Sequence, residues 1–414
     1  MEIYLVGGAV RDELLGRPVV DRDYVVTGAT PEEMVAQGYR PVGKDFPVFL
    51  HPETAEEYAL ARRERKVAAG YGGFEFHAGP EVTLEEDLSR RDLTVNAIAR
   101  SADGTLIDPF GGVDDIEARR LRHVTDAFAE DPVRVLRLAR FAARLASLGF
   151  SVVPETTMLA RQLAAAGELD ALTPERVWTE TEKGLMTANP EVFVAVLREC
   201  HALAVVLPEV DALFGVPQPA EHHPEIDTGV HLLLVLAQAA RMDLSSAARF
   251  ACLTHDLGKA LTPKDELPKH HGHEASGLKP LAQLCDRLRV PKEHRRLAEL
   301  VCRYHLQVHQ ALTLKPGTVM KLIEAADGLR RPQRFVEILR ACEADFRGRE
   351  GGNAEAPYPQ AAYLETVMTA VAAVPNAPLR AEGLEGLELA AALRRARIRA
   401  IAETKSRWQG SSPA

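Results

Sequence analysis

Hydrophobic residues follow two different patterns along this chain. Up to about residue 125, short runs rich in β-branched residues alternate with turns and helical stretches; the runs lie at 3–6, 24–26, 48–50 and 58–61. From Glu130 almost to the end, Ala, Leu and Arg recur with helical spacing. The change predicts an α+β fold in which a mixed domain is followed by all-α regions.

Local signals refine these expectations. Thr30-Pro31-Glu32-Glu33 combines an N-cap, a proline for the first helical position and an acidic residue for a capping box, so we expect a helix to start there. The segment "GYGGFEFHAGP" at 70–80 is rich in glycine, and we expect it to form a loop. Prolines and charges interrupt the helical pattern at 216–227, which predicts a domain boundary.

Charge restricts how the chain can meet a partner. The 414 residues carry a net charge of −9, which provides no bulk attraction for nucleic acid, so any RNA contact must depend on local basic patches. Such patches occur as "RRER" at 62–65, "RRPQR" at 330–334 and "LRRARIR" at 393–399. Each of them is also compatible with an ordinary solvated face.

Cysteine spacing and hydropathy indicate the compartment. The five cysteines show no C-x-x-C spacing and are expected to be reduced thiols. No charged-then-apolar signal segment opens the chain, and no run of ~18 apolar residues occurs, so we expect a cytoplasmic protein without a membrane partner.

The first chemical motif is "YLVGGAVRDELLGRPVVDRDYVV" at 4–26. If Asp21 and Asp23 lie in one strand, their carboxylates share a face, repel each other and suit a shared Mg²⁺ ion. Gly7 and Gly8 follow an apolar run and permit close approach of a phosphate, while a helix beginning near Val10 directs its amide dipoles at it. These parts predict a site for a metal-bound nucleoside triphosphate, although a surface turn before a solvated Asp-Arg-Asp edge strand is the simpler alternative.

Three motifs in order resemble one family. "LVGGAVRD…DRDYVV", "RRDLTVNAIA" at 90–99 and "EDPVRVLRLARFAAR" at 130–144 are similar to the class II tRNA nucleotidyltransferases, the CCA-adding enzymes. "HDLGK" at 255–259 resembles the bacterial subgroup with an appended HD-type phosphohydrolase domain, which extends the resemblance to nearly the whole chain.

The resemblance implies an architecture and an activity. We expect a polymerase-β-like head over residues 1–125, a helical neck and body over 126–220, an HD domain over 228–329 and a helical tail over 330–414. The head would add C, C and A to the 3′ end of tRNA from CTP and ATP without a template, releasing pyrophosphate. The partner is then the tRNA acceptor arm, read by backbone and shape, and the oligomeric state is left open between monomer and homodimer.

Roles for individual residues follow from the motifs. Asp21 and Asp23 are the expected catalytic residues and Mg²⁺ ligands of a two-metal phosphoryl transfer. Glu57 is a candidate third carboxylate, and a strand-end surface charge is an equal alternative. Arg90, Arg91, Asp92 and Asn96 are expected at the head of an apolar helix, with Asn96 ordering a loop or simply packing. The resemblance implies nucleotide binding by a group of basic and glycine residues: Gly8, Arg11, Arg91, Arg137 and Arg140.

Selection of C and A has a chemical explanation in "EDPVR". Cytosine and adenine both present an amino donor beside a ring-nitrogen acceptor, whereas uracil and guanine present the reverse. Asp131 accepting from the amino group and Arg134 donating to the ring nitrogen would accept the first two bases and reject the others on the order of 10⁴-fold. The two residues are expected to be neighbours on one helix, and Asp131 also fits an N-cap before Pro132.

Histidines form a second set of candidates. His231, His255 and Asp256 are the expected metal ligands of the HD domain, with His270, His271, His273 and His305 further along the chain. Imidazoles with a carboxylate favour a transition metal over Mg²⁺, and the resemblance implies a Ni²⁺-like ion. The final aspartate ligand and the number of metal ions stay open, and structural histidines are the alternative. The resemblance implies phosphatase, 2′-nucleotidase and 2′,3′-cyclic phosphodiesterase activities that trim damaged tRNA ends.

Two other functions fit parts of the pattern. A poly(A) polymerase of the same superfamily would share the head motifs but use ATP alone, and the long basic tail that it would need is not seen in this acidic chain. A tRNA-binding phosphohydrolase with an inactive head would have no use for the pair Asp21 and Asp23.

Overall fold

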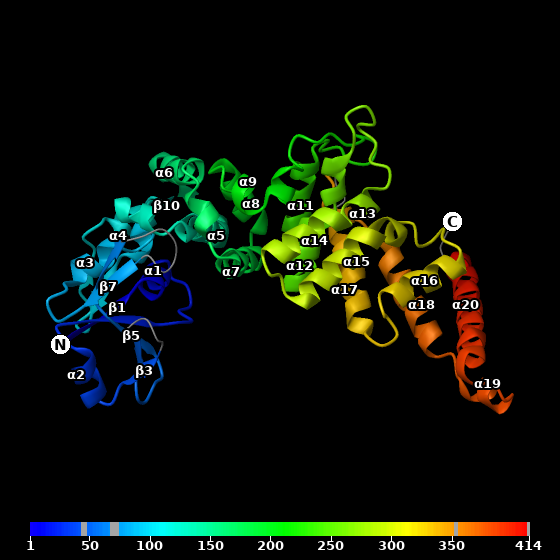
Figure 1. Cartoon of the computed structure of the whole chain (residues 1–414), viewed down its shortest axis with the longest axis horizontal. Helices are drawn as coiled ribbons and strands as arrows, with labels where there is room; N and C mark the ends of the chain where they lie inside the picture. Colours follow the sequence, from blue (N-terminus) through cyan, green and yellow to red (C-terminus); the bar gives the residue numbers. More distant parts are fainter. Residues whose placement is uncertain (43–47, 67–73, 352–354, 412–414) are drawn as a thin grey trace. The chain divides into compact units, whose positions relative to one another are not determined.

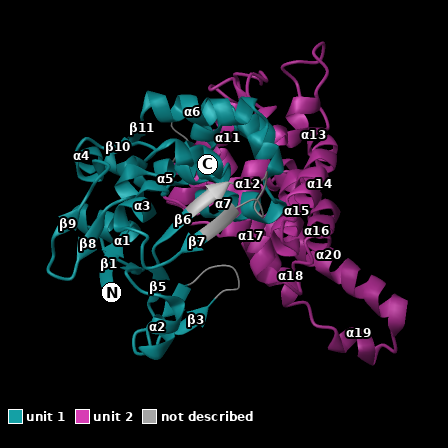
Figure 2. Cartoon of the chain, turned by 60° about the vertical axis from the view of Figure 1, so that its left-hand side comes forward, with its two compact units in different colours: residues 1–184, 192–206 teal, residues 185–191, 207–414 magenta. Residues whose placement is uncertain are grey.

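The computed structural model describes residues 1–42, 48–66, 74–351 and 355–411. These residues form two compact units (Figure 2). Unit 1 comprises Met1–Gly184 and Val192–Val206, and unit 2 comprises Leu185–Glu191 and Leu207–Ala414. The expected combination of a mixed α/β region followed by helices is confirmed (Figure 1).

Unit 1 is built on a mixed sheet. Within the described residues it has seven strands in the order β3-β4-β5-β2-β1-β8-β9. All pairs are antiparallel except β2 with β5. The strands are β1 (Glu2–Val6), β2 (Asp23–Thr27), β3 (Arg40–Val42), β4 (Val48–Leu50), β5 (Glu57–Leu60), β8 (Ala99–Ser101) and β9 (Leu106–Ile107). The four runs of β-branched residues identified in the sequence therefore form β1, β2, β4 and β5.

The sheet buries apolar side chains on both faces. Val25 and Val26, consecutive in β2, belong to two different hydrophobic clusters, because successive strand residues point to opposite faces. Helix α3 (Leu84–Ser89) contributes Leu88 to the cluster of Val25, and α2 (Pro31–Ala36) contributes Met34 to that of Val26. Helix α2 begins with the expected capping box at Thr30.

The expectation of a loop at 70–80 is wrong for its second half. Strand β7 (Phe74–Ala78) pairs antiparallel with β6 (Arg62–Lys66), which carries the "RRER" segment. The alternation Phe74-Glu75-Phe76 is a strand pattern that the surrounding glycines obscured. Residues 70–73 lie outside the described part of the chain.

Short helices and then longer ones complete unit 1. Helix α1 (Gly8–Leu14) follows β1 directly, and a two-stranded pair joins β10 (Arg120–Leu121) to β11 (Ser151–Val152). The remaining helices are α4 (Gly112–Glu117), α5 (Val133–Leu145), α6 (Pro154–Ala165), α7 (Pro174–Leu185), α8 (Pro190–Glu199) and α9 (Leu203–Val206), the last residue of α7 and the first two of α8 belonging to unit 2. A short 3₁₀ turn at Thr94–Asn96 precedes β8, and another at Asp126–Glu130 precedes α5.

Unit 2 is helical throughout its described residues. Helices α11 (Thr228–Arg241), α12 (Ser246–Thr254), α15 (Lys292–His309) and α17 (Pro332–Arg347) pack against one another and bury residues such as Phe250 and Ile338. The other helices are α10 (Pro208–Asp211), α13 (His273–Ser276), α14 (Leu278–Arg287), α16 (Pro316–Ala325), α18 (Pro359–Ala372), α19 (Ala377–Ala381) and α20 (Gly386–Ser411).

Two sequence-level expectations concern the whole chain. All five cysteines are free and buried. Burial raises the pKa of the Cys200 thiol to about 12. Among the described helices, none combines the length and the apolar composition needed to cross a bilayer.

Candidate active sites

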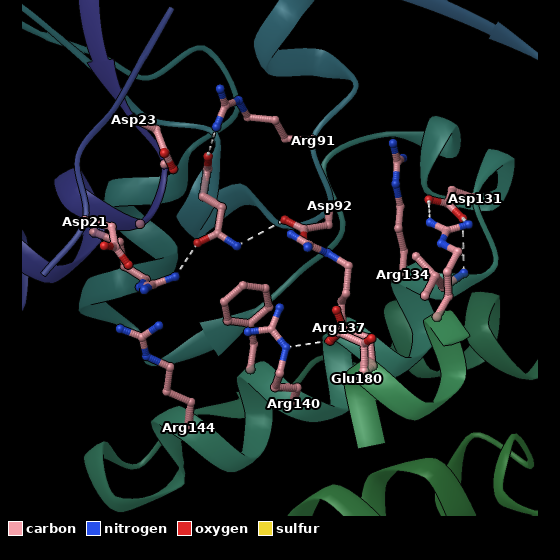
Figure 3. A pocket seen from close by; sticks show the side chains of 18 of the residues that line it. Asp21, Asp23, Arg91, Asp92, Asp131, Arg134, Arg137, Arg140, Arg144 and Glu180 are labelled. Atoms are coloured by element: carbon pink, nitrogen blue, oxygen red, sulfur yellow. Dashed lines mark hydrogen bonds and ion pairs between the residues drawn. The ribbon is translucent and has the colours of Figure 1, made fainter. Parts of the chain in front are cut away.

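A cavity of about 710 Å³ in unit 1 collects most of the polar residues that the sequence singled out (Figure 3). Asp21 and Asp23 lie at one side of it, and Asp131 and Arg134 lie at the other. The other predicted residues that line it are Gly8, Arg11, Arg91, Arg137 and Arg140. Residues separated by more than a hundred positions in the sequence thus share one polar chamber.

The glycine turn lies against an arginine. Gly7 has a φ of +69°, in the left-handed region that favours glycine, and connects β1 to α1. A Cβ atom at this position would approach Arg91 Nη1 to 2.9 Å, so a larger residue would displace the guanidinium. Helix α1 begins at Gly8, two residues before the expected start near Val10.

Of the carboxylates Asp21 and Asp23, which we expected to share a strand, only Asp23 lies in one. Strand β2 begins at Asp23, so Asp21 precedes the strand rather than sharing it, although both residues line the cavity. Asp23 is an exposed residue, yet partial desolvation of its carboxyl group raises its pKa; Arg91 opposes this rise and Asp21 adds to it. The oxygen-only donors of this pair suit a hard divalent cation.

Glu57 pairs with Asp23 in the register of the parallel strands β2 and β5. Residues in register on adjacent strands point to the same face of a sheet. Glu57 is nevertheless exposed and is not among the residues that line the cavity. Its role as a third carboxylate stays a prediction.

A buried hydrogen-bonded chain runs beneath the cavity. Arg11, only 1% exposed, donates to Asn96 Oδ1 at 2.5 Å, and Asn96 Nδ2 donates to Asp92 Oδ1 at 3.0 Å. Arg137 Nε donates to Asp92 Oδ2 at 2.8 Å. Burial alone would raise the pKa of Asp92, but Arg137 and Asn96 outweigh it and hold the pKa well below the usual range. Burial lowers the pKa of Arg11, whose neighbour Asp12 opposes the effect.

The "RRD" motif follows a helix instead of heading one. Helix α3 ends at Ser89, and Arg90 and Arg91 both bind Asp87, at 2.7 and 3.2 Å. Burial would raise the pKa of Asp87, but the two arginines lower it. The apolar stretch after the motif forms a 3₁₀ turn and strand β8, because its residues are buried on all sides and do not need helical periodicity. Asp87 was missed in the sequence, where it is one of several acids in an ordinary capping segment.

We expected Asp131 and Arg134 to lie on one helix, but only Arg134 belongs to α5. Helix α5 begins at Val133 with Pro132 as its N-cap residue, so Asp131 lies one position before the cap and accepts a hydrogen bond from the backbone N–H of Val133 at 3.3 Å. Arg176 of α7 binds both oxygens of Asp131, at 3.0 and 2.6 Å. The guanidinium of Arg134 donates to the backbone oxygens of Ala127 and Arg90.

The arginines that follow on α5 have separate partners. Arg140 Nε donates to Glu180 Oε2 at 2.6 Å and lies over the ring of Phe141, and Arg144 donates to Asp12 at 2.7 Å. Arg144, Arg176 and Glu180 line the cavity, yet the sequence analysis missed them. Arg144 follows Arg140 by four residues, which keeps it within the helical series of arginines, and it was detectable in that way.

A second constellation is buried in unit 2. His231 of α11, His255 at the end of α12 and Asp345 of α17 bring one ligand atom each within 4.8 Å of one another. Asp345 Oδ1 lies 3.1 Å from His231 Nε2 and 3.8 Å from His255 Nε2. Burial would lower the pKa of His255, but Asp256 and Asp345 raise it to about 9. A donor set of imidazole and carboxylate fits a transition-metal ion.

Asp256, His273 and His305 form a second triad beside the first. Of the later histidines, His273 and His305 therefore join the cluster, whereas His270 is held by Thr262 and the oxygen of Pro217, and His271 is exposed. Asp345 was not identified in the sequence, which left the final aspartate ligand open. It is one of three acids on α17, and only its burial, where α17 packs against α11, distinguishes it from Glu337 and Glu343.

Three family models match successive parts of the chain. Residues 3–122 match the family model of the poly A polymerase head domain, residues 149–214 that of a probable RNA and SrmB-binding site of polymerase A, and residues 228–345 that of the HD domain. The fold and the two clusters therefore define a nucleotidyltransferase that carries an HD domain.

Relatives narrow this class to one family. The multifunctional CCA protein of Pseudomonas aeruginosa is 60% identical over 401 residues, 97% of this chain and 98% of that protein. That of Thioalkalivibrio sulfidiphilus is 58% identical over 410 residues, 99% of this chain and all of that protein. The chain belongs to the family of multifunctional CCA proteins, and its expected membership among the CCA-adding enzymes is confirmed.

Solved structures share the fold at low sequence identity. The Thermotoga maritima CCA-adding enzyme complexed with tRNA has a TM-score of 0.65 at 19% identity, covering 99% of this chain and 91% of that one. The Bacillus stearothermophilus CCA-adding enzyme in complex with CTP has a TM-score of 0.63 at 22% identity, covering 99% and 94%.

Proposed function

We propose that this enzyme builds and repairs the 3′-terminal CCA of tRNA from CTP and ATP. The observation that carries the proposal is the single cavity lined by the carboxylates Asp21 and Asp23 and by the base-selecting candidates Asp131 and Arg134. The names of the full-length relatives support it, as do related structures described as complexes with tRNA, ATP and CTP.

Asp21 and Asp23 would hold Mg²⁺, which when bound activates the attacking hydroxyl and neutralises the departing pyrophosphate. In the transfer, the 3′-oxygen of tRNA forms a bond to the α-phosphorus of the nucleotide while the bond to pyrophosphate breaks, and the hydroxyl proton passes to solvent. Gly8 and Arg91 stand beside these carboxylates and would receive the triphosphate. The buried charge of Arg11 lies beneath the same turn.

Base selection is assigned to Asp131 and Arg134, with Arg137 and Arg140 completing the nucleotide site. Arg176 and the N–H of Val133 together donate three hydrogen bonds to Asp131, whose carboxylate has about four lone-pair positions. One position is left for an amino group, which cytosine and adenine both offer. Two of the five guanidinium N–H groups of Arg134 donate to the backbone oxygens of Ala127 and Arg90, and another would donate to the ring nitrogen.

We assign residues 1–125 to the catalytic head and 126–220 to nucleotide selection and tRNA contact. The expected HD domain at 228–329 and tail at 330–414 are adjusted at their boundary, because the HD-domain match extends to residue 345 and so includes Asp345. Basic segments at 62–65, 330–334 and 393–399 are the candidate contacts with tRNA phosphates. If these segments bind phosphates, the affinity for tRNA should fall steeply as the salt concentration rises. An affinity that does not change with salt would reject their assignment as phosphate contacts. We infer a cytoplasmic location from the proposed substrate, tRNA. The oligomeric state that we propose is either a monomer or a homodimer.

For the HD domain we propose phosphatase, 2′-nucleotidase and 2′,3′-cyclic phosphodiesterase activities with Ni²⁺ or a similar ion. His231, His255 and Asp256, together with Asp345, would hold the metal, which when bound supplies an activated water for attack on phosphorus. The water oxygen bonds to phosphorus, the ester oxygen leaves, and the water's proton returns to the leaving alcohol. Lys259 Nζ, 2.7 Å from Asp256, places a cation at the same cavity.

The test uses tRNA transcripts that lack CCA, with Mg²⁺ and each labelled nucleotide alone, and then CTP with ATP. Addition of C, C and A followed by arrest, lost in Asp21→Ala, supports the proposal. Unlimited addition of A indicates a poly(A) polymerase, and no incorporation moves the function to the HD domain. The HD activities are tested with His255→Ala, which should abolish them while CCA addition continues; unchanged activities would reject that assignment.

A further inference from the structure

The HD cluster contains two complete ligand triads that share no residue. His231, His255 and Asp345 form one, and Asp256, His273 and His305 form the other. All six residues are buried. His255 and Asp256 are consecutive in the chain but belong to different triads, so the two triads are held side by side by the backbone.

The histidine rings are oriented with their free nitrogens inward. Nδ1 of His255 lies 2.8 Å from the oxygen of Cys252, that of His273 lies 2.7 Å from the oxygen of His270, and that of His305 lies 3.1 Å from the oxygen of Cys302. A carbonyl oxygen only accepts, so each Nδ1 must carry the proton that it donates. In the neutral rings, each Nε2 then presents a lone pair.

His231 is oriented in the same way by a carboxylate. Its Nδ1 lies 2.7 Å from Glu225 Oε1, whose side chain is buried. The carboxylate takes the place that a carbonyl oxygen has in the other three histidines, which is the arrangement that fixes metal-binding rings in proteins. Nε2 of His231 accordingly faces Asp345.

The second triad needs a positive charge between its members. His273 Nε2 and His305 Nε2 face each other at 3.1 Å, and Asp256 Oδ1 lies 3.3 and 3.7 Å from them. Two lone pairs and a carboxylate oxygen in one buried space repel one another unless a cation binds there. Oδ2 of Asp256 lies 2.7 Å from Lys259 Nζ, whereas among the described residues Oδ1, which faces His273 and His305, finds no hydrogen-bond partner.

The two triads differ in access. Asp256, His273 and His305 line a cavity of about 130 Å³ together with Lys259 and Asp345. His231 and His255 are not among the lining residues. The second triad is therefore the one that a substrate phosphate entering the cavity would meet.

We propose that the HD cluster binds two divalent transition-metal ions: an inner ion on His231, His255 and Asp345, and an outer ion on Asp256, His273 and His305. The proposal deepens the assignment of a metal-dependent phosphohydrolase, on which its functional meaning rests, but metal binding can be measured without any substrate. Imidazole with carboxylate suits ions such as Ni²⁺ and Mn²⁺. The outer ion, next to Lys259, would bind the phosphate.

The experiment counts ions in the full-length chain. Asp21→Asn with Asp23→Asn removes the head ligands, and this parent is stripped of metal, dialysed against micromolar Ni²⁺ and analysed by mass spectrometry for nickel per chain. We expect two. His273→Gln should bind one ion tightly and weaken the second by at least ~10-fold. His271→Gln, which alters an exposed neighbouring histidine, should still bind two.

A count of one or none in the parent, or an undiminished count of two in His273→Gln with His305→Gln, overturns the proposal. Circular dichroism establishes that each variant is folded. Electron paramagnetic resonance of the parent loaded with Mn²⁺ is an independent measurement of whether two ions bind side by side, since ions about 3.5–4 Å apart give an exchange-coupled spectrum. Two bound ions without phosphohydrolase activity would reject the proposed function alone. Activity with one bound ion would reject the present inference alone.

Discussion

Arg137 and Asp92, 45 positions apart, form a charged hydrogen bond of 2.8 Å that connects helix α5 to the segment behind the sheet of unit 1. The carboxylate is buried, and Asn96 binds its other oxygen. The pair lies between the two sides of the cavity, with Asp23 on one side of it and Asp131 on the other (Figure 3).

The depressed pKa of Asp92 predicts a pH-dependent contribution to stability. A folded-state pKa below the unfolded value of about 3.9 stabilises the protein above that value, and this contribution is lost as pH falls toward the folded pKa. We expect Asp92→Asn to lower the melting temperature of unit 1 by about 4–8 °C at pH 7. Calorimetry from pH 7 to pH 3 should give a constant difference down to about pH 5 that shrinks below pH 4. A difference that grows in acid would contradict the assignment.

Asn96→Ala should destabilise unit 1 because it leaves the buried guanidinium of Arg11 without one acceptor. An unsatisfied buried donor costs about 1–3 kcal/mol in the free energy of unfolding. Gln37→Ala, an exposed amide in the same unit, should change this free energy by less than about 0.5 kcal/mol. Denaturant unfolding of both variants makes the comparison, and equal effects would mean that the buried contact contributes nothing specific.

Asp131→Ala should reduce the preference for CTP and ATP over UTP. If its last acceptor position reads the amino group, discrimination should fall from on the order of 10⁴-fold to about 10²-fold or less. The ratio is measured with single nucleotides on tRNA lacking CCA. Asp126→Ala, an exposed acid in the preceding turn, is the control and should keep full discrimination. Slower addition with unchanged discrimination would limit Asp131 to a structural role.

Glu57→Gln distinguishes a third metal ligand from a surface charge. Since Glu57 is exposed and does not line the cavity, we expect addition to fall by less than about 3-fold, against at least ~10² for Asp23→Asn. Rates at saturating and limiting Mg²⁺ make the measurement. A loss comparable to that of Asp23→Asn, partly recovered at high Mg²⁺, would identify Glu57 as a ligand after all.

Much of the candidate site was visible in the sequence because its motifs are short. Gly7-Gly8, Asp21 and Asp23 lie within 17 positions, and "HD" is a consecutive pair, so spacing alone suggested their chemistry. The residues that were missed, Asp87, Arg176 and Asp345, are single charged residues on helices. Nothing near them in the chain distinguishes them from solvated charges, because their partners come from other helices or from an adjacent turn.

The sequence by itself determined the four strands β1, β2, β4 and β5, the first capping box, the helical second half and the family, since these depend on periodicity and on short motifs within the chain. Only the tertiary structure decided that Arg176 binds Asp131, that Asn96 bridges Arg11 and Asp92, and that Asp345 completes the histidine cluster. The physical reason is burial: a charged group removed from water must find its partner in three dimensions, and the chain supplies that partner from any distance along its length.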